Sequence, residues 1–425
     1  MGCGARQRQP IRQAVGGPVT RRLRTPSPGN TLGGLLGGLG RRPLVAIAAF
    51  FFMTGVMGTR PLVPLASLEL EIGAGEIGVL VAVYSIVPLF LAMPVGRWMD
   101  SHGTRNILLG SAVAGSAGLL LPSMWLSREG MYVSQLITGC GWAVFILAAQ
   151  KNIGEAGRDT WSREKNVAVF GLGTALGSFF GPMIGGLMSD FTGFGWAYFT
   201  LGLITLGSFP VLLPLPNDRR EPTSKPQQVL SRNPLRIFGY HRYMKRAFLI
   251  SSLILMAKDM YVAYFPVYAH TLGISASWVG VIIAIQNGGG VIMRVVLLPL
   301  VRRFGKNNVV IYSIFLSGVF FLAIPLVDDL VFLTLVSLAI GLGLGLGQPL
   351  SITTTINLAP PEKVGEVLGF RLSCNRLTQV VAPLVFGTVV LFTGAVATFW
   401  LVGLILALGC IKLRIPSEER CSQSL

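Results

Sequence analysis

Long apolar runs alternate with short polar breaks along most of the chain. Four runs contain no Asp, Glu, Lys or Arg, namely residues 107–127, 191–217, 330–361 and 377–411. A helix of about 20 apolar residues is long enough to cross the hydrocarbon core of a bilayer. The pattern therefore predicts a polytopic membrane protein.

The same pattern predicts twelve spanning helices in two groups of six. The first six are expected at 44–67, 76–96, 106–126, 131–150, 167–189 and 194–214. The second six are expected at 246–269, 276–300, 308–327, 330–352, 364–392 and 395–413. Equal halves suggest a duplication, which recurs among transporters. The predicted fold is all-α, with two pseudo-symmetric six-helix bundles in the membrane.

The predicted domain organisation follows from where the spans stop. The two bundles cover 44–214 and 246–413, and the polar stretch 215–245 links them. Residues 1–43 are rich in Arg, Gly and Pro without an apolar period, so we expect a basic, disordered tail. Residues 414–425 form a second short tail.

The composition agrees with a membrane protein. Of the 425 residues, 52% are hydrophobic and 12% are charged, and the mean hydropathy is +0.64. Soluble proteins carry about 25% charged residues. A soluble enzyme, a disordered chain and a coiled coil are therefore excluded.

The positive charges indicate an orientation. The chain has 35 Lys and Arg against 18 Asp and Glu, a net charge of +17. Outside the predicted spans, the basic residues lie in the tails and the loops on the same side, and the opposite side has Arg128 alone. Basic loops stay in the cytoplasm. We expect both termini to be cytoplasmic in a plasma (bacterial inner) membrane, and the basic charge needs no nucleic-acid partner.

Nothing in the sequence indicates a cofactor, a metal or a disulfide. The five cysteines, of which Cys140, Cys374 and Cys410 lie in apolar runs, form no CxxC pattern, and there is no His cluster. The glycine-rich run 341–347 lies inside an apolar span, and no GxxxxGK[ST] occurs. We expect neither an enzyme nor an ATP-driven pump.

A polar loop between the second and third spans carries a GxxxDxxGxR pattern. Its residues are Gly96, Asp100, Gly103 and Arg105. The pattern resembles the signature loop of the major facilitator superfamily, in which the aspartate bridges the two halves and helps to hold the outward-facing state. The resemblance implies a gating role for these four residues. The equivalent second-half loop keeps Gly305 but has Arg302 at the position of the aspartate.

The fifth span carries a string of small residues that looks like the antiporter motif of drug-exporting facilitators. The string is formed by Gly177, Gly181, Pro182, Gly185 and Gly186. The resemblance implies a second gating element, and small-residue helix packing is the alternative.

The fourth span departs from the family pattern. The family's arginine, which is tied to proton coupling, would precede Gly139 by four residues, where this chain has Gln135. Proton coupling must then rest on another residue.

Ionisable residues inside spans are costly and mark candidate sites. Lys258 and Asp259 lie near the middle of the seventh span, and Asp259 is the only carboxylate predicted near mid-membrane. Both are candidates for proton coupling, with a structural charge pair as the alternative. The substrate-binding candidates are Arg60, Arg376, Asn375, Gln379, Tyr261, Tyr264, Gln286, Asn287, Trp142 and Gln150.

The resemblance implies a secondary carrier that works by alternating access around a midplane site. We expect a monomer in the lipid bilayer that exports a small amphipathic molecule in exchange for protons. Two alternatives stay open. One is proton-coupled uptake of an organic anion or sugar, and the other is a transport-inactive receptor or assembly partner.

Overall fold

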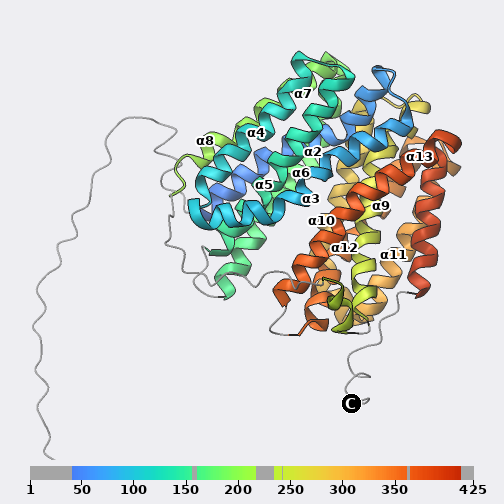
Figure 1. Ribbon diagram of the computed structural model, residues 1–425. Helices are drawn as coiled ribbons and strands as arrows, with labels where there is room; N and C mark the ends of the chain where they lie inside the picture. The colour runs from blue at the N-terminus through green and yellow to red at the C-terminus, as the bar shows by residue number, and fades with distance from the viewer. Residues whose placement is uncertain (1–40, 156–159, 217–233, 242, 361–363, 413–425) are drawn as a thin grey trace, which may run out of the picture.

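The computed structural model describes residues 41–155, 160–216, 234–241, 243–360 and 364–412, which contain helices and no strand. Figure 1 shows the helices as two bundles, one running from blue to green and the other from yellow to red along the chain. The expected disorder of the tail 1–43 concerns residues that lie almost entirely outside this described part, as do most of the linker and the C-tail.

The first bundle contains six spans. Its helices are α2 (Arg41–Glu69), α3 (Ala74–His102), α4 (Arg105–Met124), α5 (Arg128–Glu155), α6 (Thr160–Thr192), α7 (Phe194–Leu206) and α8 (Ser208–Leu212). The last two meet at Gly207 and together form one candidate span of 19 residues. Several helices extend past the predicted apolar runs, because the polar residues at the ends continue the helix beyond the lipid.

The described part of the second bundle contains five α-helices. They are α9 (Met244–Thr271), α10 (Ala276–Phe304), α11 (Lys306–Ala323), α12 (Leu330–Leu358) and α13 (Val364–Lys412), with short 3-10 helices η1 (Pro234–Gly239) before α9 and η2 (Ile324–Leu326) after α11.

Helix α13 accounts for two spans. Eleven helices in the described part are long and apolar enough to cross a membrane, and the last has 44 residues. At 1.5 Å per residue it would reach about 66 Å, twice the thickness of the hydrocarbon core. The backbone of Gly394 is not helical (φ 76°), so the chain turns there. This turn confirms the prediction of twelve spans in two six-helix bundles.

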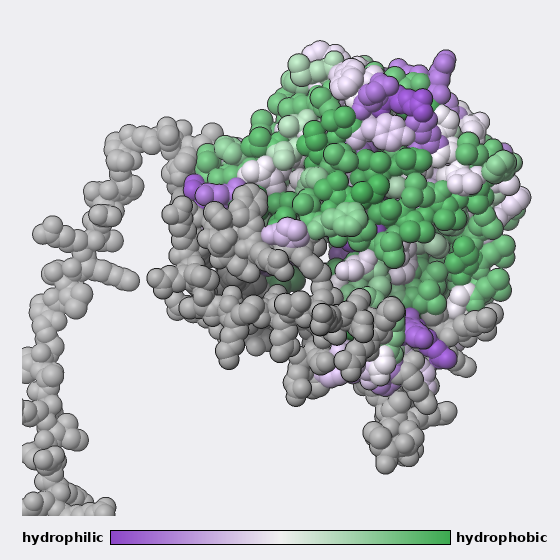
Figure 2. Space-filling view, in the orientation of Figure 1, coloured by the Kyte–Doolittle hydropathy of each residue, from purple (hydrophilic) through white to green (hydrophobic). Residues whose placement is uncertain are grey.

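The outer surface fits a lipid environment. Figure 2 shows a broad hydrophobic band across the molecule, with hydrophilic residues gathered towards its edges. Helix α11 shows the pattern in detail: Phe315, Leu316 and Val319 are exposed, whereas Ser313 and Ser317 are buried against the rest of the bundle. Such a stripe of exposed apolar residues is stable in lipid and not in water.

Among the described residues, the hydrophobic packing between the two halves lies at one end. We call the end with the loops 70–73, 125–127, 272–275 and 327–329 the hairpin end, and the end with residues 41 and 412 the terminal end. At the hairpin end, one buried hydrophobic cluster joins Leu65, Ile77 and Val81 of the first half to the core of the second. At the terminal end, each cluster of described residues stays within one half.

Candidate functional site

An ion pair joins the two halves near the middle of α9. Arg60 of α2 donates through Nη2 to Oδ1 of Asp259 in α9, at 3.3 Å. The two side chains are only 17% and 9% exposed. Helix α2 is the first helix of one half and α9 is the first long helix of the other, and the two pack against each other. The sequence left Arg60 without a partner in its own half, and the other half supplies one.

A glutamine connects this pair to a second arginine. Gln379 of α13 donates through Nε2 to Oδ2 of Asp259 at 2.9 Å. Its Oε1 accepts a hydrogen bond from Nη1 of Arg376 at 2.7 Å. The spacing of three residues places Arg376 and Gln379 on one face of α13. Both oxygens of the Asp259 carboxylate are therefore hydrogen-bonded.

Two aromatic rings of the first half complete the site. The guanidinium carbon of Arg60 lies 4.9 Å from the ring centre of Tyr84 in α3. That of Arg376 lies 4.5 Å from the Trp142 ring in α5. The two ring centres are 5.9 Å apart. Both contacts have cation–π geometry. We call Arg60, Tyr84, Trp142, Asp259, Arg376 and Gln379 the central cluster.

Neighbouring residues Lys258 and Asp259 occupy different environments. Asp259 is 7% exposed and faces the contact between the halves, whereas Lys258 is exposed. Consecutive helical residues point in directions about 100° apart. Asp259 thus pairs across the halves with Arg60, and Lys258 points in another direction, within electrostatic reach of Arg294, Asp259 and Arg60.

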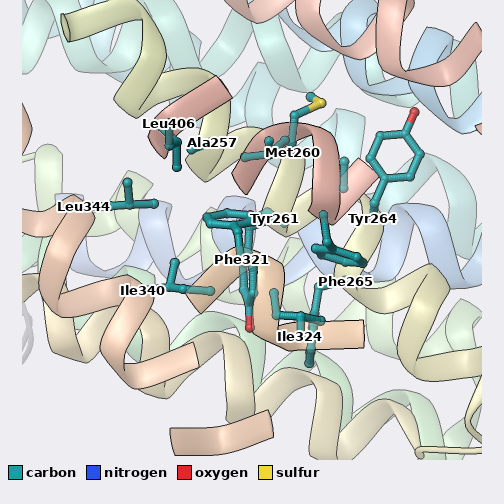
Figure 3. Close-up of a cluster of buried hydrophobic side chains, with 14 of the residues drawn as sticks. Ala257, Met260, Tyr261, Tyr264, Phe265, Phe321, Ile324, Ile340, Leu344 and Leu406 are labelled. Atoms are coloured by element: carbon teal, nitrogen blue, oxygen red, sulfur yellow. The ribbon is translucent and has the colours of Figure 1, made fainter. Parts of the chain in front are cut away.

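Three other predicted residues lie within the second half. The Asn375 side-chain oxygen accepts a hydrogen bond from Ser251 at 2.8 Å. Tyr261 donates to Ser337 at 2.6 Å and packs on Phe265 and Phe321 in the core, as Figure 3 shows. Gln286 is buried, with its backbone close to Gly341. None of the three joins the central cluster.

The remaining candidates are spread along the interface. Asn287 donates across the halves to the carbonyl of Ser178 at 3.1 Å. Figure 3 shows Tyr264 projecting away from Tyr261 and its neighbours. The Tyr264 hydroxyl is buried beside Gly78 of the first half, near the hairpin end. Gln150 is exposed near the terminal end of α5.

The small-residue string of α6 has two faces. A methyl group on Gly177 or Gly185 would lie 2.7 Å from a backbone oxygen of α2, and one on Gly181 would lie 2.8 Å from the Gly58 nitrogen. A methyl group on Gly186 would instead meet Ala276 and Gly280 of α10, and Gly280 lies against Pro182. One face therefore packs within the first half and the other across the halves.

A carboxylate also bridges the halves at the hairpin end. Asp190, near the end of α6, accepts hydrogen bonds from the backbone nitrogens of Ala276 at 3.1 Å and Ser277 at 2.8 Å. These nitrogens belong to the first two residues of α10. The side chain of Ser275, which precedes the helix at the N-cap position, makes no capping hydrogen bond. A negative charge at a helix N-terminus is favourable. Asp190 thus caps a helix of the other half.

The loop with the GxxxDxxGxR pattern is described in part. Gly103 has φ 76° and ends α3 with a hydrogen bond to the Met99 carbonyl. Arg105 donates from Nη2 to the Leu213 carbonyl at 2.7 Å, which ties α4 to the end of the sixth span. The surroundings of Gly96 and Asp100 lie outside the described side chains, so their gating role stays a prediction.

No group of three or more His, Cys, Asp or Glu that could hold a metal comes together among the described residues. The contacts of the central cluster are a charge pair, hydrogen bonds and cation–π contacts.

Comparisons with known proteins agree with this architecture. The model of the Major Facilitator Superfamily matches residues 45–377 and 247–422. Multidrug resistance protein 1 of Bacillus subtilis (strain 168) is 23% identical over 75% of this chain and 82% of its own length. The class G tetracycline resistance protein of Vibrio anguillarum is 25% identical over 80% and 87%.

Solved structures show the same fold. The nucleoside transporter NupG aligns with a TM-score of 0.73 at 16% identity, covering 88% of this chain and 97% of its own. A POT family transporter in complex with 5-aminolevulinic acid has a TM-score of 0.73 at 12% identity, with 88% and 95% covered. With two packed six-helix halves, a polar cluster between them and a family match over most of its length, the chain belongs to the major facilitator superfamily and is a membrane transporter rather than an enzyme.

Proposed function

We propose that the protein is a proton-coupled antiporter that exports a small amphipathic compound, with Asp259 as the proton-binding residue. The observation that carries this proposal is the Arg60–Asp259 pair, which ties the two halves together at mid-membrane. Alternating access requires the halves to rock about a midplane site. A charge pair between the halves is therefore well placed to couple rocking to protonation.

Protonation changes the strength of this tie. An ionised Asp259 attracts Arg60, whereas a protonated carboxyl is neutral. Removing one charge from a buried pair leaves the other uncompensated, which costs about 3–5 kcal/mol. Proton binding would thus weaken the contact between the halves and free Arg60 for a ligand. The span-4 position of the family's coupling arginine holds Gln135, so Asp259 fills the role from another helix.

Two features support the export direction: the resistance proteins among the relatives, and the distribution of basic residues. Relatives of the chain are named for multidrug and tetracycline resistance. In the proposed topology the basic tails and loops place the terminal end in the cytoplasm. The halves would then be packed together on the outside and separate on the inside, so that the central cluster is reached from the cytoplasm. The cluster is complete within one chain, which supports a monomer as the working unit.

Uptake of an organic anion is the second candidate. It is favoured by the charge of the central cluster, which holds two arginines and one carboxylate. Transport assays in vesicles of both orientations distinguish export from uptake.

The first prediction tests Asp259 in proteoliposomes with an imposed proton gradient. Asp259→Asn removes the titrating group and keeps its shape, so uphill accumulation should stop while downhill exchange of substrate persists. Glu129→Gln, an exposed carboxylate at the start of α5, is the matched control and should behave like the wild type. An Asp259→Asn protein that still concentrates substrate with unchanged pH dependence would exclude Asp259 from coupling.

A further inference from the structure

We infer that the transported compound is an organic anion with an apolar body, and that Arg376 and Trp142 form its binding site. This inference rests on the proposed transport function but not on its direction.

The charge balance at mid-membrane carries the first step. Among the described residues away from the ends of the spans, Arg60, Lys258, Arg294, Arg371 and Arg376 are the cations, and Asp259 is the only carboxylate. Arg60 compensates the negative charge of Asp259 directly through the ion pair. Arg376 is hydrogen-bonded to the neutral amide of Gln379, which is bonded to that carboxylate, and its own interaction with Asp259 acts at longer range. A cation inside a membrane protein is costly unless a counter-charge compensates it. A bound anion would supply the missing charge.

The hydrogen-bonding groups carry the second step. The Trp142 side-chain nitrogen is buried and has no hydrogen-bond partner among the described residues. An indole N–H can only donate. Next to it, Arg376 offers several N–H donors, of which one is used by Gln379. A buried donor without a partner destabilises the protein. The unfilled positions call for an acceptor, and a carboxylate is the acceptor that also carries charge.

The exposure pattern carries the third step. Lys258 is exposed although most of α9 around it is buried, and Arg294 of α10 is exposed as well. The two cations are close enough to influence each other. Like charges that share accessible space raise the local potential and attract anions. They would draw an anion towards Arg376 from the terminal end.

The aromatic groups indicate the rest of the ligand. Trp142 is partly exposed and lies against Tyr84 and Arg376. Ligand pockets usually combine such apolar surfaces with a few polar groups that fix the orientation. An aryl or alkyl body beside Trp142, with its carboxylate on Arg376, fits this arrangement.

The experiment compares ligands that share a body and differ in charge. Purified full-length protein is titrated by calorimetry with phenyl, naphthyl and indolyl butyrates, with their amides and with the corresponding amines. We expect a carboxylate to bind at least about tenfold more tightly than its amide, as for a hydrogen bond to a charged group, and the amines not to bind. Arg376→Gln should remove this preference while leaving amide binding unchanged.

Two further variants serve as controls for this test. Arg303→Gln removes an exposed cation at the end of α10 and should bind like the wild type. Arg376→Lys keeps the charge and should retain a weaker carboxylate preference, which separates loss of the site from loss of the fold. The inference is overturned when no carboxylate binds above its amide, or when folded Arg376→Gln keeps the wild-type carboxylate affinity.

The binding assay needs no proton gradient, so failure of the proposed function is seen separately. Carboxylate preference without proton movement in proteoliposomes would contradict proton coupling and leave the anion site intact. Proton-coupled transport of amines would overturn the anion site and leave the coupling intact.

Discussion

At the scale of single residues, charges in apolar runs were the informative signal. Arg60, Asp259 and Arg376 could be singled out from the sequence because a charge inside a span is rare. Their pairing could not, since Arg60 and Asp259 are 199 residues apart. Tyr84 was missed because a tyrosine in an apolar span is ordinary, and only the folded chain shows its ring beneath Arg60.

The relay through Gln379 leads to a prediction about stability. Gln379→Leu removes the hydrogen bond to Asp259 and the one from Arg376, leaving a buried carboxylate oxygen without a partner. We expect a loss of about 1–3 kcal/mol, measured as a lower melting temperature of the purified protein.

Gln150→Leu serves as its control, because Gln150 is exposed. Equal melting temperatures for the two variants would show that the Gln379 bonds contribute nothing to stability.

At the scale of the elements, apolar runs predicted the spans well because membrane helices must satisfy their own backbone. The turn between the last two spans, expected between 392 and 395, occurs at Gly394. The small-residue string of α6 was also visible. Its division into two faces was not, because the sequence does not say which neighbour each glycine meets.

The two faces predict two different phenotypes for the same substitution. Gly181→Ala would press a methyl group against α2 within the first half, so thermal stability should fall by about 1–3 kcal/mol. Gly186→Ala would press against Ala276 of α10 and should push the halves apart at the hairpin end. The measure is a lower cross-linking yield between cysteines placed by Asp190→Cys and Ser277→Cys.

Gly171→Ala is the matched control on the same helix, since nothing lies within 4 Å of its added methyl group. A Gly186→Ala protein that cross-links as well as the Gly171→Ala protein would argue against a moving contact at this face.

At the scale of the whole molecule, the sequence predicted the architecture but not the state. The duplicated halves and the basic loops can be recognised from the amino-acid composition of each segment. Whether the halves meet at one end or the other depends on a small balance between contacts, such as Asp190 on α10 and the hydrophobic cluster around Leu65. Both arrangements use the same helices, so the pattern of spans cannot distinguish them.

Removing the cap on α10 should therefore shift the protein towards a state in which the hairpin end is open. Asp190→Ala removes a cap across the halves, which is worth about 1 kcal/mol, so the hairpin end should open about fivefold more often. A maleimide should react correspondingly faster with a cysteine introduced by Leu68→Cys in a background without native cysteines.

Asp328→Ala is the control for this shift, because Asp328 lies at the same end and contacts Tyr268 within its own half. Equal reaction rates for the two variants would show that the Asp190 cap does not hold the halves together.

The surplus of cations around Asp259 has a consequence for the energy source. An exporter that releases a monoanion and admits one proton moves two positive charges inward per cycle. At a membrane potential of about 100 mV each charge gains about 2.3 kcal/mol, so the two charges together gain about 4.6 kcal/mol per cycle. That is enough for a gradient of more than about a thousandfold. Such a carrier would run on membrane voltage even where the pH is equal on both sides.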